Sequence, residues 1–219
     1  GLSFESPGNV SEPCTEFVSD PAKPVPYRVR PIGLSSSIGD STWGRWLVDD
    51  QRPFSDRPDV LTFVSEPLAA PITVRGEVIT TLFASTTGTD ADWVVKLIDL
   101  YPNEVPAQPV MGGYQLMICG DILRGRYREN RAEARPIPPG EVLPYQVPLP
   151  HVNHTFLPGH RFMVQIQSSW FPLYDRNPQT FVDNIAWAAP EDFQKATHEI
   201  HHADGAASFV ELSIQKEGA

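Results

Sequence analysis

The segment from Gly159 to Thr180, GHRFMVQIQSSWFPLYDRNPQT, carries a clear strand pattern followed by turn residues. Between residues 161 and 168, the apolar Phe162, Val164 and Ile166 are expected on one face of a pleated strand, and Met163, Gln165 and Gln167 on the other. The strand is followed by the aromatic loop Trp170–Asn177, which contains proline and asparagine. Such an alternating run closed by turn residues predicts a β-strand in an antiparallel sheet.

The same pattern recurs on both sides of this stretch. The segment Asp92–Tyr101 is apolar on both faces, which is expected of a central strand, and Gly76 or a neighbour allows a bulge or turn. Twenty-three prolines oppose long helices. The further predicted strands are Val60–Glu66, Ile72–Thr86, Ile122–Glu129, Val142–Leu149 and Phe209–Ile214. Seven or more strands with long connections predict an all-β, jelly-roll β-sandwich.

The 219 residues are expected to form a single domain, because all-β sandwiches often reach this length. Residues 1–31 carry closely spaced prolines and predict an extended Pro-rich N-terminal arm. The sandwich is then expected over residues 32–219.

The formal net charge of −10 opposes binding to nucleic acid or to an anionic membrane surface. No apolar stretch reaches the length of a membrane-spanning helix, and residues 1–10 lack the pattern of a signal peptide. Cys14 and Cys119 are expected as free thiols, although one bridge between them stays open. We expect no cofactor, and the compartment is left open between periplasm and cytoplasm, the periplasm being favoured.

The sequence HEIHH, from His198 to His202, matches the zinc-protease signature H-E-x-x-H. That chemistry requires a helix, which places both histidines on one side. Here Ala203–Gly205 forms a turn signal before a strand pattern, so we expect a run of histidines on an edge strand and no metal site. Adventitious metal binding is the intermediate alternative.

Signatures of other catalytic centres are missing. A serine hydrolase needs a G-x-S-x-G elbow, and the nearest approach, Gly33–Ser37, lacks the closing glycine. Asp92 and Asp99 lie seven residues apart on one predicted strand and so point to opposite faces, which excludes a shared acid–base site. Asp92 is instead expected to accept hydrogen bonds from a turn or to pair with an arginine of the stretch RGRYRE.

Two groups of side chains could face a partner. The alternating Arg124, Arg126 and Arg128 predict a solvated sheet face, with a contact face for a partner domain as the alternative. The aromatic loop around Trp170 suits a sugar-stacking platform or an interface anchor, with a cap on the core as the alternative for Phe171. Trp43 and Trp46 present the same choice.

Several long phrases of the sequence resemble one enzyme family. They are FVSDPAKPVPYRVRP (17–31), DDQRPFSDRPDVLTFVSEPL (49–68), DWVVKLIDLYP (92–102), RGRYRE (124–129), LPGHRFMVQIQSSWFPLYDRNPQT (157–180) and QKATHEI (194–200). In this order they are similar to the C-terminal domain of the X-Pro dipeptidyl-peptidase and cocaine esterase hydrolases. Within that group they look most like the α-amino acid ester hydrolases, including enzymes described as glutaryl acylases.

This resemblance implies a galactose-binding-like jelly roll that follows an α/β-hydrolase domain with a helical cap. The family's catalytic Ser, Asp and His precede this domain, so no catalytic residue can be assigned here. The implied partner is the α/β-hydrolase domain of the same parent protein, with a homo-oligomer as a further option. By position, Ser41–Trp46 would help to wall the neighbouring acyl pocket.

The resemblance and the surface residues together give one set of candidates for the pocket wall or domain interface. They are Trp43, Trp46, Arg124, Arg126, Trp170, Phe171, Tyr174, Asp175 and Arg176. The alternative function is a carbohydrate-binding module, and a third hypothesis is a zinc hydrolase that uses His198 and His202.

Overall fold

The computed structural model describes residues 1–5, 12–30, 43–203 and 205–215. The strands are β1 Cys14–Ser19, β2 Val60–Val64, β3 Ile72–Thr86, β4 Asp92–Leu100, β5 Gln115–Arg124, β6 Leu143–Phe156, β7 Arg161–Gln167, β8 Ala196–His201 and β9 Phe209–Ile214. The helices are short: α1 Arg52–Ser55 and the 3₁₀ turns η1 Trp43–Val48, η2 Pro109–Met111, η3 Gly125–Tyr127, η4 Ile185–Trp187 and η5 Pro190–Asp192. The prediction of an all-β sandwich is confirmed.

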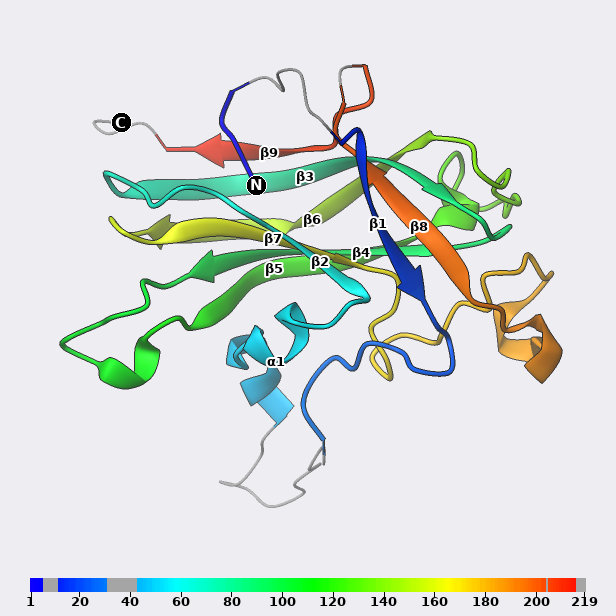
Figure 1. The fold of residues 1–219 in the computed structure, drawn as a ribbon, viewed down its shortest axis with the longest axis horizontal. Coiled ribbons are helices and arrows are strands. Elements are labelled where there is room, and N and C mark those ends of the chain that lie inside the picture. Colours follow the sequence, from blue (N-terminus) through cyan, green and yellow to red (C-terminus); the bar gives the residue numbers. More distant parts are fainter. Residues whose placement is uncertain (6–11, 31–42, 204, 216–219) are drawn as a thin grey trace.

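The strands form two antiparallel sheets (Figure 1). One sheet has the order β1-β8-β3-β6, and the other has the order β2-β7-β4-β5. The long strand β3 pairs with β6 along one edge, while β8 and β9 share its other edge. Strands that are distant in sequence therefore become neighbours, as β1 and β8 do.

Aromatic side chains join the inner faces of the two sheets. Trp93 of β4 lies 5.1 Å from Tyr145 of β6, and Phe156 of β6 lies 4.0 Å from Phe162 of β7, measured between ring centroids. All four side chains are buried. Aromatic pairs at such distances stabilise a core beyond the area that they bury.

Strand β4 is buried on both faces along Asp92–Asp99, as its nearly continuous apolar sequence predicts. The five-stranded sheet covers one face. The other face of β4 is covered by α1 and by chain segments that are far from β4 in sequence. These lie beneath β4 and β5 in Figure 1. This second covering carries most of the residues that the sequence singled out.

Three strand boundaries differ from the prediction by five residues or more, and the first is that β5 begins at Gln115 instead of Ile122. Strand β5 ends at Arg124 instead of continuing to Glu129, because the chain turns at Gly125. A Cβ on Gly125 would lie 2.8 Å from Ile137 Cδ1 and 2.9 Å from the Ala91 oxygen, so only glycine fits this turn. Strand β6 continues past the predicted end at Leu149, whereas β3 has its predicted bounds and a register shift after Gly76.

The N-terminal segment is more than an extended arm. Cys14–Ser19 forms the edge strand β1 and pairs along its length with β8. Because β1 covers that side, β8 is an interior strand, and the expectation of histidines on an edge strand is wrong. Part of the predicted arm therefore belongs to the sandwich.

Candidate docking surface

Three chain segments cover the outer face of the four-stranded sheet, and we call them the outer layer: residues 24–28, 43–55 and 169–176. The first and third are joined by backbone hydrogen bonds from Tyr27 to the Phe171 oxygen and from Phe171 to the Val25 oxygen, both 2.9 Å. The Val25 amide also donates to Ser169 Oγ. These bonds fix the aromatic loop against the N-terminal segment.

Aromatic rings connect the three segments of the outer layer. Trp46 lies 6.1 Å from Tyr27 and 6.2 Å from Trp170, in edge-on geometry, and Trp170 stacks on Tyr174. Trp170 itself is only 3% exposed and packs on the apolar side chains of the sheet, including Val94. The loop is therefore a cap on the core, and Trp170 offers no ring face to a sugar.

Lys96 projects from β4 into this layer and is fully buried. Its Nζ atom donates to Gln51 Oε1 at 3.0 Å and lies 5.1 Å from the ring centroid of Trp170 and 5.5 Å from that of Phe54. Burial lowers the pKa of Lys96 to about 7.

Polar contacts fasten the segment 43–55 to the sheet. The backbone N–H of Gln51 donates to the backbone oxygen of Gln115 in β5 at 3.1 Å. Gln165 Nε2 of β7 donates to Ser55 Oγ at 2.8 Å. On the other side, Arg28 forms an ion pair with Asp49 at 3.0 Å. The segment is thus held by both of its neighbours in the outer layer and by two strands.

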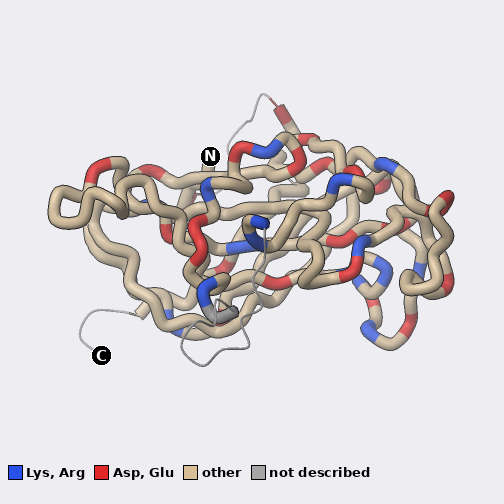
Figure 2. Tube along the Cα trace, turned by 90° about the horizontal axis from the view of Figure 1, so that it is seen from below, with Lys and Arg blue, Asp and Glu red and all other residues tan. Residues whose placement is uncertain are grey.

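This fastened segment presents apolar side chains to solvent. Leu47 is 54% exposed and Val48 is 56% exposed, and Val29, which follows Arg28, is 58% exposed. Elsewhere in the described chain, acidic and basic residues are interleaved along the tube (Figure 2). A group of exposed apolar residues on an ordered segment is typical of an interaction surface.

At one side of the outer layer, Arg176 lies between two aromatic rings. Its guanidinium carbon is 5.6 Å from the centroid of Phe171 and 5.0 Å from that of Phe193, and its Nη1 donates to the Pro21 oxygen. Arg176 and the two aromatic residues line an open hollow of about 640 Å³. Asp175 is exposed at its rim.

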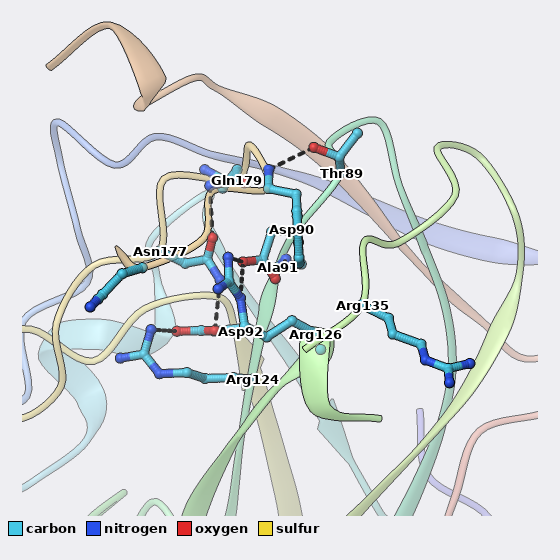
Figure 3. Close-up of polar contacts among 12 residues, drawn as sticks. Thr89, Asp90, Ala91, Asp92, Arg124, Arg126, Arg135, Asn177 and Gln179 are labelled. Atoms are coloured by element: carbon cyan, nitrogen blue, oxygen red, sulfur yellow. Dashed lines mark hydrogen bonds and ion pairs between the residues drawn. The ribbon is translucent and has the colours of Figure 1, made fainter. Parts of the chain in front are cut away.

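A buried polar network closes the end of β4 (Figure 3). Asp92 accepts a hydrogen bond from Asn177 Nδ2 at 2.8 Å and faces Arg124 Nη1 at 3.6 Å. Arg124 also donates to the Asp175 oxygen. Burial raises the pKa of Asp92 to about 7, and Arg124 opposes that shift. The predicted pairing of Asp92 with an arginine is confirmed.

Arg126 corrects the prediction of a solvated arginine stripe. It is 2% exposed and binds the buried Asp90 carboxylate through Nε at 2.8 Å and Nη2 at 2.7 Å. Its guanidinium also lies 4.7 Å from the Phe181 ring. The turn at Gly125 ends the alternation of the strand, so Arg126 points inward.

Asp99 belongs to a different group of polar residues from Asp92. It accepts hydrogen bonds from His154 Nε2 and His160 Nδ1, both at 2.8 Å. The two aspartates therefore serve separate networks, as the spacing of seven residues predicted.

His198 to His201 of the H-E-x-x-H sequence lie on strand β8 and His202 directly follows it, so the helix that the zinc chemistry requires is not formed. His198 is fully buried between the rings of Phe17 and Trp93, and burial lowers its pKa to about 3. Glu199 faces the other way and accepts a hydrogen bond from Ser85 Oγ. Among the described residues, no group of three His, Cys, Asp or Glu could hold a metal ion.

The structure brings seven predicted site residues together in or beside the outer layer. They are Trp46, Arg124, Trp170, Phe171, Tyr174, Asp175 and Arg176. Gly33–Ser37, Ser41 and Thr42 lie outside the described residues, and the side chain of Trp43 is also outside them. The sequence did not predict three further residues of this site, which are Lys96, Gln51 and Tyr27. The one available signal was that Lys96 is a lysine within an apolar central strand.

The two cysteines lie outside the outer layer, and the helices of the described residues are short. Cys14 of β1 and Cys119 of β5 are free thiols. Across the described ranges, we find no helix with the length and apolar character needed to span a membrane.

Comparison with known proteins gives the family. Residues 36–211 match the model of the X-Pro dipeptidyl-peptidase C-terminal non-catalytic domain. The chain is 35% identical over 206 residues to a cocaine esterase from Rhodococcus sp. (strain MB1 Bresler), which covers 94% of this chain and 33% of the relative. The resemblance to this hydrolase group is therefore confirmed.

Two solved structures share the fold along nearly the whole chain. An aminopeptidase from the marine sediment archaeon Thaumarchaeota archaeon has a TM-score of 0.93 and 56% identity, over 97% of this chain and 35% of its own. An α-amino acid ester hydrolase has a TM-score of 0.93 and 50% identity, over 97% of this chain and 34% of its own. The chain thus spans about a third of the length of these relatives. It belongs to the X-Pro dipeptidyl-peptidase C-terminal non-catalytic domain family.

Proposed function

We propose that residues 1–219 are the single C-terminal domain of a serine hydrolase, and that the outer layer packs against the α/β-hydrolase domain of that parent protein. The domain would comprise an N-terminal segment, residues 1–31, which contributes β1 to the sandwich, and the body of the sandwich, residues 32–219. Support comes from the family and from the third of each relative that the chain covers. Interfaces between domains of one chain commonly bury about 600 to 1,500 Å².

The observation that carries this proposal is the exposure of Leu47 and Val48 on a segment that is firmly attached to the sheet. An apolar group on an ordered segment loses little conformational freedom when a partner covers it. The same residues would favour self-association of the chain when the partner domain is missing, which is the homo-oligomer expected from the sequence.

The parent reaction would be acyl transfer through a covalent acyl-enzyme, with esters or amides of α-amino acids as the substrate class. The names of the two structural relatives, an aminopeptidase and an α-amino acid ester hydrolase, support this class. The nucleophile would come from the hydrolase domain. Residues 41–46, including Trp43 and Trp46, would wall its acyl pocket.

The candidate interface residues would act in two ways. The contact surface would extend beyond η1 through Phe171, Tyr174, Asp175 and Arg176. Arg124 would support this part of the surface through its hydrogen bond to the backbone oxygen of Asp175. The buried Trp170 and Arg126 would contribute indirectly by holding the outer layer and the polar network in place.

The test is binding between this chain and the separately produced hydrolase domain of its parent, measured by calorimetry. Leu47→Asp and Val48→Asp should each weaken binding by about tenfold or more, because they place a charge in an apolar contact. Ile214→Asp is the matched control, since Ile214 is 52% exposed on β9 of the other sheet.

Two results would contradict the proposal. One is loss of binding with Ile214→Asp but not with the η1 variants. The other is full activity and unchanged stability of the hydrolase domain without this chain.

A further inference from the structure

Lys96 lies under the proposed docking surface, and no carboxylate among the described residues pairs with it. Its ammonium group is fully buried, and its polar contacts are amide oxygens: Gln51 Oε1 at 3.0 Å and Gln165 Oε1 at 3.5 Å. Two aromatic ring faces complete the surroundings. A buried ammonium without a counter-ion is costly, because these dipoles replace only part of its hydration.

The segment 43–55 supplies the lid over this amine. Gln51 accepts a hydrogen bond from Nζ, the Phe54 ring lies 5.5 Å from it, and Ser55 hydrogen-bonds to Gln165 beside it. On the sheet side, a Cβ on Gly120 would lie 3.2 Å from Lys96 Cγ, so glycine makes room for the lysine stem. Water can hydrate Nζ only if this lid moves away.

The carboxylates of the lid and of β5 are engaged by other groups. On the lid, Asp49 pairs with Arg28, and Asp50 pairs with Arg52. On β5, Asp121 accepts a hydrogen bond from the Ile122 amide. The contacts from β7 and from the aromatic loop are the uncharged Gln165 and Trp170.

We propose that Lys96 is a proton-linked anchor of the docking surface: lifting of residues 43–55 hydrates the amine and is coupled to uptake of one proton. In the closed state the amine is neutral or is charged at a cost. In the open state it behaves as an ordinary lysine. Alkaline conditions therefore hold the lid closed, and neutral or acidic conditions loosen it.

The pH range follows from the two states of Lys96. Its pKa is about 7 when it is buried and 10.5 when it is exposed. The open state binds more protons between these two values, so the opening equilibrium should fall about tenfold for each pH unit from 7 to 10.5. Below pH 7 both states are protonated, and the dependence should disappear.

The direct test is amide hydrogen exchange of residues 43–55 in the 219-residue chain between pH 6 and 9.5, corrected for the intrinsic rate. Protection should be constant below pH 7 and should rise about tenfold per pH unit above it. Lys96→Met should abolish the rise, whereas the control Lys195→Met should keep it, because Lys195 is 67% exposed. The same rise in Lys96→Met would overturn the proposal.

A second measurement does not depend on folding of a variant. The Lys96 Nζ resonance of the unmodified chain should titrate near pH 7, and a midpoint above 9 would refute the anchor. The link to docking rests on the function proposed above. Binding of the hydrolase domain should slow the exchange of residues 43–55 at pH 7; if no binding occurs at any pH while exchange of the chain alone follows the expected pattern, the docking proposal fails and the anchor stands.

Discussion

Arg126 and Asp90 are both buried, and the guanidinium binds the carboxylate through two nitrogens. Burial raises the pKa of Asp90, and the neighbouring Arg126 opposes that shift. Removal of one member of such a pair leaves the other charge buried without compensation. The stability of this end of the sandwich therefore depends on both residues being present.

Arg126→Met should lower the free energy of unfolding by about 3 to 5 kcal/mol in urea denaturation. The double variant Asp90→Asn with Arg126→Met should lose less than the sum of the single variants, because it leaves no unpaired charge. Arg135→Met is the control. Arg135 is 55% exposed in its pairs with Glu129 and Glu133, so about 1 kcal/mol or less is expected; equal losses in both arginine variants would contradict the assignment.

His198 makes the free energy of unfolding depend on pH in the acidic range. Its pKa is about 3 in the folded chain and 6.5 once the side chain is exposed by unfolding, so the unfolded chain binds more protons between these values. Stability should fall as pH decreases from 6.5 to 3, by about 1.4 kcal/mol per pH unit from this residue. In His198→Phe, the change in the free energy of unfolding per pH unit, measured by urea denaturation, should be smaller by that amount. His151→Phe, at a position 73% exposed, should leave the slope unchanged, and a reversed result would refute the account.

At the scale of elements, β1 shows how a proline-rich segment can still contribute a strand. Cys14–Ser19 contains no proline and pairs with β8 in register. Phe17 points inward and is 3% exposed, whereas Val18 points outward and is 52% exposed. The strand thus closes the core on the side of His198.

Phe17→Ala should destabilise the chain by about 3 to 5 kcal/mol, as expected for loss of a buried aromatic ring. Val18→Ala, one residue away on the opposite face, should change stability by about 0.5 kcal/mol or less. Thermal unfolding by calorimetry measures both. Similar effects in the two variants would mean that β1 lies on the sandwich as a loose arm.

Most strands could be predicted because their side chains alternate or remain apolar along the run, as in β3, β4 and β7. The end of β5 could not, since it depends on the contact of Gly125 with Ile137, which is distant in sequence. The inward turn of Arg126 follows from the same cause. For the site, the aromatic composition marked the outer layer, but the burial of Trp170 and Lys96 arises only when three separate segments meet over the sheet.

At the scale of the whole molecule, the two thiols report on different motions. Cys119 is 6% exposed within the core, and burial raises its pKa to about 12. Cys14 is partly exposed at the start of the edge strand. Their reactivities should therefore separate local fraying from global unfolding.

In native buffer, a thiol reagent should label Cys14 quickly and Cys119 only at the rate or population set by global unfolding. The slow phase should accelerate with urea in parallel with the loss of the β-sheet circular dichroism signal. Cys14→Ser should retain the slow phase alone. Fast labelling of Cys119 in native buffer would show that the core opens without global unfolding.

The pairing of β1 with β8 also bears on synthesis at the ribosome. Strand β1 is translated before β2 to β7, whereas its hydrogen-bonding partner β8 follows them. Closure of this side of the core must therefore await synthesis of the chain through His201. Until then, Phe17 and its neighbours remain uncovered, which is the interval in which a nascent chain gains most from a chaperone.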